Sequence, residues 1–121
     1  MDKKKTLVLG ASDNPSRYSY LAIHRLRNYG HPVIAIGRRH TMVGDTEIKT
    51  TKDPVEGIDT VTLYMNAKHQ KEYHDYILSL QPRRIIFNPG AENDELAALA
   101  RQQGIKTMEA CTLVMLSTGQ Y

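Results

Sequence analysis

The sequence predicts an α/β fold of the Rossmann-like, doubly wound type, with a mainly parallel sheet of five to six strands and helices on both faces. Short apolar runs alternate with amphipathic segments along the chain, which is the pattern of βαβ units. Turn-forming residues separate these segments. The 121 residues are expected to form one domain, residues 1–121, because domains of about 100 to 200 residues are usual.

The first strand is expected over residues 6–9, a β-branched and aliphatic run that ends at Gly10. A polar, turn-rich segment follows it. Residues 19–29 then place apolar side chains on one face of a helix, and Gly30 ends that helix. Pro32 prevents the helix from continuing. These segments form the first half of a βαβ unit.

The middle of the chain supplies further strands. Residues 33–36 form the second strand, which a glycine and a basic turn close. From residue 41 to residue 57 the pattern is weak, and we expect a short edge strand around residues 47–50 with a turn at Asp53 and Pro54. The next strand covers residues 61–64.

The second half of the chain repeats the alternation of strand and helix. Asn93 is expected to cap a helix, because its side chain can accept a hydrogen bond from the first turn. The elements expected here are a helix over 67–80, a strand over 84–87, a helix from Asn93 to Gly104, a strand over 106–109 and a short helical turn over 112–116.

In a sheet of this kind the ligand crevice lies beyond the carboxyl ends of the strands, near the point where the strand order reverses. The loops that follow the strands are therefore expected to converge. The candidate ligand-binding residues in these loops are Gly10, Ala11, Ser12, Ser16, Arg17, Ser19, Tyr20, Gly37, Arg38, Arg39, Met65, Asn66, Asn88, Pro89 and Gly90.

The loop after the first strand can take phosphate oxygens. Gly10 lets the backbone approach a ligand closely, and the following helix presents backbone N–H groups. Ser12, Ser16 and Ser19 add hydroxyl donors. Arg17 adds a positive charge. The loop lacks the second and third glycines of the G-x-G-x-x-G dinucleotide motif, so an ordinary strand-to-helix turn is the alternative interpretation.

The basic turn after the second strand is more informative. Enzymes that bind NAD place an acidic residue there to accept from the adenosine ribose hydroxyls, whereas a basic residue accommodates a phosphate on that ribose. Arg38 and Arg39 follow Gly37, so a phosphorylated ribose, as in coenzyme A or NADP, fits and NAD fits poorly. A solvated basic surface turn is the alternative.

The other chemistry-bearing residues predict no catalytic residue and no metal ligand. Cys111 lies in an apolar C-terminal stretch, where a small core residue is more common than a nucleophile. The five histidines show no metal-ligand spacing and are interpreted as surface or structural residues. The G-x-S-x-G motif is absent, and the acidic residues form no pair. The Asn88-Pro89-Gly90 turn is also compatible with plain loop chemistry.

Composition limits the compartment and the partners. The single cysteine excludes an internal disulfide framework and fits the reducing cytoplasm. The apolar stretch near the N-terminus is too short for a signal peptide, and no run of about 18 apolar residues exists to cross a membrane. The net charge of +3 is too small to demand nucleic acid. We expect a cytoplasmic protein with a small-molecule nucleotide ligand and with neither nucleic acid nor membrane as partner.

Four blocks of residues lie in a specific order over nearly the whole chain. They are LVLGAS at residues 7–12 with the following Asp13-Asn14-Pro15 and Ser19-Tyr20, the Ile36-Gly37 turn, FNPGAE at residues 87–92, and EACTLVM at residues 109–115. In this order the chain resembles the small stand-alone CoA-binding domain proteins, which are similar to the N-terminal domain of the succinyl-CoA synthetase alpha subunit.

The resemblance implies a Rossmann-like fold that holds coenzyme A or an acyl-CoA. The diphosphate would lie near residues 10–12 and 16–20, the phosphorylated adenosine near Gly37 and Arg38, and the pantetheine along residues 88–90. In the synthetase the catalytic histidine lies in a second domain, for which 121 residues leave no room, so the ligase chemistry is not carried over.

We therefore expect CoA binding without catalytic machinery in this chain. Two alternatives from other classes remain at this point. One is an NADP-linked oxidoreductase, and the other is a protein-interaction module with a vestigial nucleotide crevice, acting by self-association or through a tyrosine-bearing helix that contains Tyr73 and Tyr76.

Overall fold

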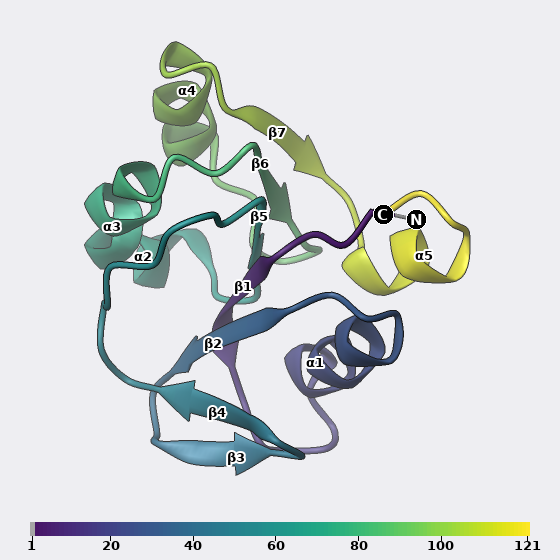
Figure 1. Cartoon of the computed structure of the whole chain (residues 1–121). Helices are drawn as coiled ribbons and strands as arrows, with labels where there is room; N and C mark the ends of the chain where they lie inside the picture. Colours follow the sequence, from purple (N-terminus) through teal and green to yellow (C-terminus); the bar gives the residue numbers. More distant parts are fainter. Residues whose placement is uncertain (1) are drawn as a thin grey trace.

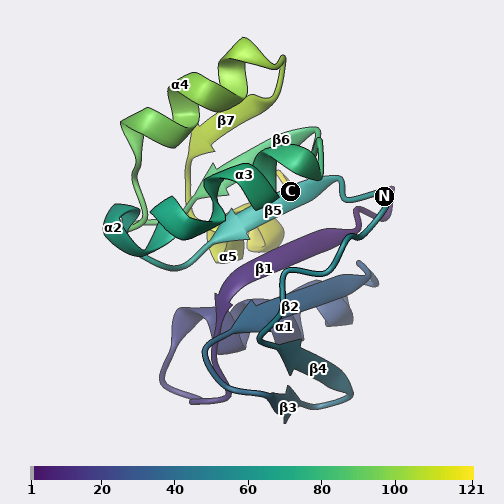
Figure 2. The same cartoon turned by 90° about the vertical axis from the view of Figure 1, so that its left-hand side faces the viewer.

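The computed structural model describes residues 2–121, which form a seven-stranded sheet with helices on both faces (Figures 1 and 2). The strand order is β3-β4-β2-β1-β5-β6-β7, and every neighbouring pair is parallel except β3 and β4. The strands are β1 (Thr6–Ala11), β2 (Val33–Gly37), β3 (Thr41–Val43), β4 (Thr46–Lys49), β5 (Thr60–Leu63), β6 (Arg84–Phe87) and β7 (Lys106–Glu109).

Two groups of helices cover the two faces of the sheet. The helices α1 and α5 lie on one face, and α2, α3 and α4 lie on the other, as the two views agree (Figures 1 and 2). Their bounds are α1 (Tyr18–Asn28), α2 (Ala67–Gln70), the 3₁₀ turn η1 (Lys71–Tyr73), α3 (His74–Ser79), α4 (Asp94–Gln102) and α5 (Thr112–Ser117). The doubly wound α/β fold predicted from the sequence is confirmed.

The core consists of two apolar layers, one on each side of the sheet. Along β1, Leu7 and Leu9 pack with α3 and α4, whereas Val8 packs with α1 and α5. Both faces of β1 are therefore buried, which explains why its sequence is a continuous apolar run rather than an alternating one. Burial at about 25 cal/mol per Å² of apolar surface makes these layers the main source of stability.

The sheet has more strands than the five to six expected. The additional one is β3, which forms an antiparallel hairpin with β4 through Gly44 and Asp45. Val43 and Ile48 of this hairpin are buried, but Met42 is exposed. A three-residue strand is too short for an alternation of apolar and polar residues to be recognised. Only the turn residues that follow it indicate a hairpin.

The helix expected over residues 67–80 consists of three pieces. The α2 and α3 helices are joined by η1, in which the coil tightens to 3₁₀ geometry. The sequence pattern cannot reveal this change, because over a single turn the i→i−3 and i→i−4 bonding patterns place apolar side chains on nearly the same face. The other helices begin within one residue of the expected position, and Asn93 caps α4 by accepting from the N–H of Leu96 at 3.1 Å.

A cluster of polar and aromatic side chains lies at the amino ends of the strands. Tyr121 is 5% exposed, and its hydroxyl is hydrogen-bonded to Thr6. The centroid of the Tyr121 ring lies 4.9 Å from that of the His31 ring. The guanidinium carbon of Arg84 lies 4.4 Å from the same Tyr121 centroid. The backbone N–H of Lys4 donates to His31 Nδ1 at 2.9 Å. The C-terminal residue is thereby packed against the start of β1.

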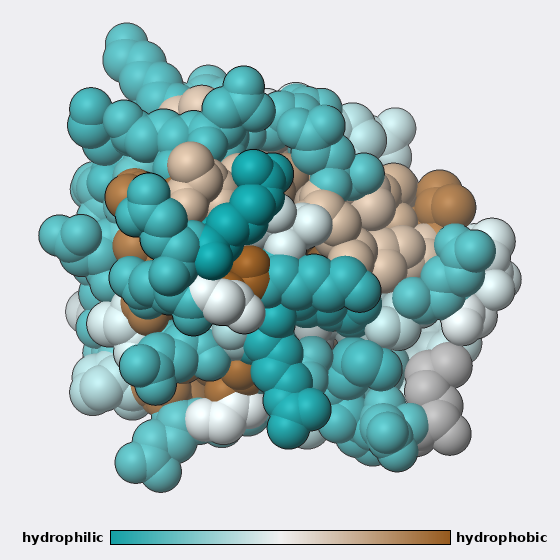
Figure 3. Space-filling model, turned by 90° about the horizontal axis from the view of Figure 1, so that it is seen from above, coloured by the Kyte–Doolittle hydropathy of each residue, from teal (hydrophilic) through white to brown (hydrophobic). Residues whose placement is uncertain are grey.

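The face of the molecule seen from above is largely polar. Figure 3 shows hydrophilic residues over most of the face seen from above, with smaller hydrophobic areas between them. Within residues 2–121, no helix has the length and apolar character needed to span a bilayer.

Candidate functional site

A groove of about 680 Å³ opens at the carboxyl ends of the central strands. It lies where the chain leaves β1 for β2 on one side and later returns to β5 on the other side of β1, so it is at the reversal of strand order. Its lining residues are Gly10, Ala11, Ser12, Asp13, Asn14, Arg17, Tyr18, Ser19, Gly37, Arg38, Arg39, Thr41, Tyr64, Met65, Asn66, His69, Glu72, Tyr73 and Pro89.

Two glycines allow three strands to meet closely below this groove. Gly10 has φ +92°, and a Cβ atom on it would lie 3.1 Å from the backbone carbon of Tyr64. A Cβ atom on Gly37 would overlap the carbonyl oxygen of Ala11. Glycine is therefore required at both positions for steric reasons, and the absence of side chains leaves the backbone open to a ligand.

The N-terminus of α1 opens on the groove without a capping side chain. Arg17 occupies the N-cap position, its side chain makes no capping hydrogen bond, and the first turn carries no acidic residue. By contrast, α4 is capped by Asn93 and carries Asp94 and Glu95 in its first turn. The free N–H groups and the positive end of the helix dipole at α1 provide an environment suited to an anion.

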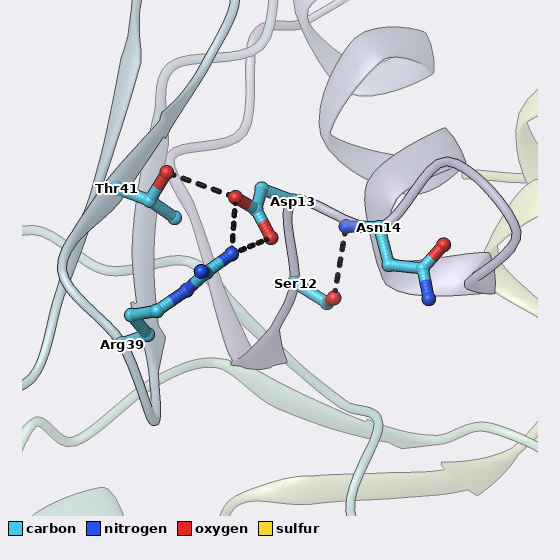
Figure 4. Close-up of polar contacts among 5 residues, drawn as sticks. All are labelled: Ser12, Asp13, Asn14, Arg39 and Thr41. Atoms are coloured by element: carbon cyan, nitrogen blue, oxygen red, sulfur yellow. Dashed lines mark hydrogen bonds and ion pairs between the residues drawn. The ribbon is translucent and has the colours of Figure 1, made fainter.

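The side chain of Asp13 joins two walls of the groove (Figure 4). Its carboxylate accepts from Arg39 Nη2 at 2.7 and 2.6 Å and from the Thr41 hydroxyl at 3.0 Å. The Arg39 hydrogen bonds are the main reason that the pKa of Asp13 lies below its usual value, with the Thr41 hydrogen bond second. The positive charge of Arg39 is thus largely neutralised within the protein.

Arg38 is placed differently from its neighbour. Its Nη2 atom lies 3.4 Å from Nδ1 and 3.5 Å from Nε2 of His69, and no carboxylate within residues 2–121 forms an ion pair with it. Both side chains are exposed and line the groove. Of the two arginines predicted to take a phosphate, Arg38 is therefore the one with an available charge.

A buried hydrogen-bond network holds α2 against the groove. Asn66 caps α2 by accepting from the N–H of His69 at 3.0 Å. The buried side chain of Gln70 donates to the carbonyl oxygens of Met65 and Ala91, at 2.7 Å each, and accepts from Asn93 at 2.8 Å. The backbone that carries His69 is therefore fixed from both sides.

Two tyrosines near the groove have altered acidity. Burial raises the pKa of Tyr64 to about 12, so its hydroxyl stays protonated at neutral pH. Burial is also the main cause of a raised pKa at Tyr73, with the nearby Glu72 carboxylate second. Neither phenol is an available base at neutral pH.

Most of the residues predicted to bind a ligand are brought together. Gly10, Ala11, Ser12, Arg17, Ser19, Gly37, Arg38, Arg39, Met65, Asn66 and Pro89 line the groove. The residues that do not line it are Ser16, Tyr20, Asn88 and Gly90.

The four predicted residues outside the lining set have identifiable contacts of their own. Ser16 donates to the Asn14 side chain at 2.8 Å, and the Tyr20 ring packs edge-on against His24. The N–H of Gly90 donates to Glu92 at 2.9 Å. Asn88 is 3% exposed and forms three hydrogen bonds within the core.

Several lining residues escape prediction from the sequence, above all Asp13 and His69. Asp13 lies within the loop after β1, but its reach across to Arg39 depends on the pairing of β1 with β2. The position of His69 near the start of a helix that follows a strand end was an available signal. Cys111, expected in the core, is partly exposed and does not line the groove.

Solved structures similar to this chain share its fold. A crystal structure described only as an uncharacterized protein is 47% identical, with a TM-score of 0.97 and full coverage of both chains. A hypothetical protein from Pyrococcus horikoshii is 20% identical with a TM-score of 0.87, covering 96% of this chain and 83% of that one. A Thermus thermophilus protein is 21% identical with a TM-score of 0.82, covering 98% and 91%. The last two establish only the fold.

A family model covers almost the entire chain and includes every segment that builds the groove. The model is described as the CoA binding domain, and it matches residues 4–117. The strands and loops that bring Gly10, Gly37 and Arg38 together all lie within this match. The chain therefore belongs to the CoA binding domain family.

Proposed function

We propose that this chain, as a single domain of residues 1–121, binds coenzyme A or an acyl-CoA in the groove at the carboxyl ends of the strands. The diphosphate lies against Ser12 and the N-terminus of α1, and the 3′-phosphate lies at Arg38. The observation that carries the proposal is the convergence of an uncapped helix N-terminus and an unpaired arginine on one groove.

The groove has two separate elements of positive charge, which favours a ligand with two anionic groups. One anion-binding element is the α1 N-terminus with Arg17, and the other is Arg38 beyond Gly37 on the adjacent strand. Coenzyme A carries a diphosphate and a ribose phosphate, so it satisfies both elements at once. Membership of the CoA binding domain family supports this assignment.

The proposed activity is binding alone, in the cytoplasm. Within the groove the two carboxylates are Asp13 and Glu72, and Asp13 is engaged by Arg39. With binding as the only proposed activity, the chain would act as a sensor or carrier of CoA.

Calorimetric titration of the purified protein with CoA, 3′-dephospho-CoA, NADPH and NADH tests the proposal. We expect CoA to bind and dephospho-CoA to bind more weakly, because the contact with Arg38 is lost. Preference for NADPH would favour the oxidoreductase alternative. Absence of binding by all four ligands would reject the proposal and favour a protein-interaction role.

Two matched variants separate the roles of the arginines. Arg38→Ala is expected to remove most of the preference for CoA over dephospho-CoA, since a charge-assisted hydrogen bond contributes about 1.5–3 kcal/mol. Arg39→Ala is expected to keep more of that preference, because Asp13 already occupies its guanidinium. Equal discrimination by Arg38→Ala and the parent would show that the phosphate lies elsewhere.

A further inference from the structure

We infer that this protein forms a symmetric dimer in which β7 of one copy pairs antiparallel with β7 of a second copy, so that the two sheets join into one. The inference does not depend on CoA binding, because the surface concerned shares no lining residue with the groove at Ser12 and Arg38. It stands on the free backbone groups of β7 and on two charged side chains beside them.

The β7 strand lies at one end of the sheet, and no strand within residues 2–121 pairs with its outer side (Figure 1). The N–H groups of Lys106 and Ala110 donate to backbone carbonyl oxygens on the side of β6, at 3.1 Å each. Because successive residues of a strand direct their N–H and C=O groups to opposite sides, those of Thr107 and Glu109 point outward. They form no hydrogen bond within residues 2–121. Such an edge is a template for another strand.

A groove of about 300 Å³ opens beside this edge, between β7 and α4. Arg101 of α4 donates from Nε to the hydroxyl of Thr107 at 3.1 Å, so its guanidinium lies at the edge. Glu109 lines the same groove. Arg101 and Glu109 are both exposed, and neither forms an ion pair within residues 2–121. The edge thus carries one positive and one negative charge, which a second copy of the same edge can match.

Two-fold symmetry leaves few ways to pair β7 with itself, because the bonded residues must be the ones that face outward. If Thr107 met Thr107 of the second copy, Glu109 would have to bond to Ile105, whose N–H already donates to the Ala100 carbonyl at 3.0 Å. If Glu109 met Glu109, two like charges would lie opposite one another, which is destabilising. The remaining register pairs Thr107 of each copy with Glu109 of the other.

This register satisfies the free groups of both copies. The N–H and C=O of Thr107 bond to those of Glu109 in the second copy. Directly opposed Cβ atoms lie about 4.5–5.5 Å apart, so that carboxylate also reaches Arg101 beside Thr107. On the other face Met108, which packs against the apolar layer of α1 and α5, meets Met108 of the second copy at the symmetry axis. Backbone hydrogen bonds, ion pairs and an apolar centre therefore act together.

Sedimentation velocity over a range of protein concentrations tests the assembly. We expect the parent protein to form a dimer that dissociates on dilution. Met108→Lys is expected to be monomeric, because it places two like charges at the symmetry axis. Met42→Lys is the matched control, because Met42 is 53% exposed on β3 at the opposite edge of the sheet. It is expected to dimerise like the parent.

A charge exchange tests the ion pair. Arg101→Glu is expected to weaken the dimer, because two carboxylates then meet across the contact. Adding Glu109→Arg to this variant is expected to restore the dimer, since opposite charges again face one another. Sedimentation velocity of the single and double variants measures both effects.

Cysteine cross-linking tests the register, with copper phenanthroline as the oxidant and in a Cys111→Ser background. Met108→Cys is expected to form a disulfide-linked dimer, because the Cα atoms of a directly opposed, non-hydrogen-bonded pair lie about 4.5 Å apart, within the range of a disulfide. Lys106→Cys is the matched control. In this register Lys106 faces Ala110, so the two copies of residue 106 lie about 14 Å apart, and no cross-link is expected.

Three results would overturn the inference. A parent protein that stays monomeric at every concentration would leave the edge to a strand of another protein. Dimerisation of Met108→Lys as strong as that of the parent, or equal cross-linking of Met108→Cys and Lys106→Cys, would place the contact elsewhere. None of these results affects the proposed CoA binding, which calorimetry measures independently.

Discussion

Asp13 is the groove carboxylate whose negative charge is held by a neighbouring arginine, and this makes it the side chain to test first. Asp13→Asn removes a negative charge from an anion-binding groove and frees Arg39 from a 2.6 Å ion pair. We expect several-fold tighter CoA binding at low ionic strength, and a smaller gain at high salt because exposed charges are screened. Titration at two salt concentrations measures this effect.

The control for Asp13→Asn is Glu47→Gln, which removes an exposed acid that pairs with His40 away from the groove. It is expected to change CoA binding little. Weaker binding by Asp13→Asn would mean that the contact of Asp13 with Arg39 and Thr41 matters more for shaping the groove than for its charge.

Asn88, predicted as a ligand contact, has a different set of partners in the structure. Its amide nitrogen donates to the Thr62 hydroxyl at 2.7 Å and to the Leu63 carbonyl at 2.9 Å, and its oxygen accepts from the N–H of Thr112 at 2.9 Å. Asn88→Ala leaves buried polar groups unpaired, at about 1–3 kcal/mol each. We expect urea unfolding to show a loss of at least about 2 kcal/mol, with the ratio of CoA to dephospho-CoA affinity unchanged in the folded protein. A stable variant with poor CoA binding would reverse this assignment.

Among the elements, buried parallel strands were the most predictable. Residues 84–87 coincide with β6, because a short apolar run bounded by turns has few other uses in a chain of this size. Residues 106–109 coincide with β7, which is an edge strand with half-buried central residues. Strand β3 and the 3₁₀ turn η1 were not predicted, because short elements depend on tertiary contacts more than on local pattern. The same distinction holds for the site. The site residues that directly follow strand ends could be predicted from the sequence. Asp13 and His69 belong to the site through contacts between different elements, which the sequence does not reveal.

The contact between β1 and β2 gives a prediction at the scale of elements. In Gly37→Ala the new methyl group meets the Ala11 carbonyl oxygen and the Ile48 side chain, so the two strands must separate. Overpacking of this kind costs about 1–3 kcal/mol, and the shift moves Arg38 away from the α1 N-terminus. We expect lower stability by urea denaturation together with weaker CoA binding. Parent-like values for both would show that the strands adapt without moving the groove.

The pH dependence of folding belongs to the molecule as a whole, because it reports the cluster in which His31 and Tyr121 pack at the amino ends of the strands. Burial, with the positive charges of Lys4, Lys3 and Arg84, lowers the pKa of His31 below 6.5, whereas Asp59 acts in the opposite sense. The unfolded chain then binds the proton more readily than the folded one. The contribution of His31 to stability is therefore complete above pH 6.5 and is lost as the pH falls toward its lower folded pKa.

Urea denaturation at about pH 7.5 and pH 5 measures this dependence. We expect lower stability at the acid end, where a proton on His31 places another positive charge beside Lys4 and Arg84 and against the Tyr121 ring. His31→Gln is expected to reduce the difference between the two pH values. An unchanged difference in that variant would assign the acid sensitivity to other groups.

Arg38 lies in the connection between β2 and the β3–β4 hairpin, and this position has a consequence for ligand choice. The residues from Arg38 to His40 connect β2 to the β3–β4 hairpin, and Arg38 and Arg39 are exposed, whereas the two apolar layers and the His31–Tyr121 cluster lie elsewhere. If Arg38 selects the ligand phosphate as proposed, substitutions in this short connection would alter which nucleotide is preferred with little effect on folding. Libraries confined to residues 38–40 are then a practical route to domains that accept other phosphorylated nucleotides.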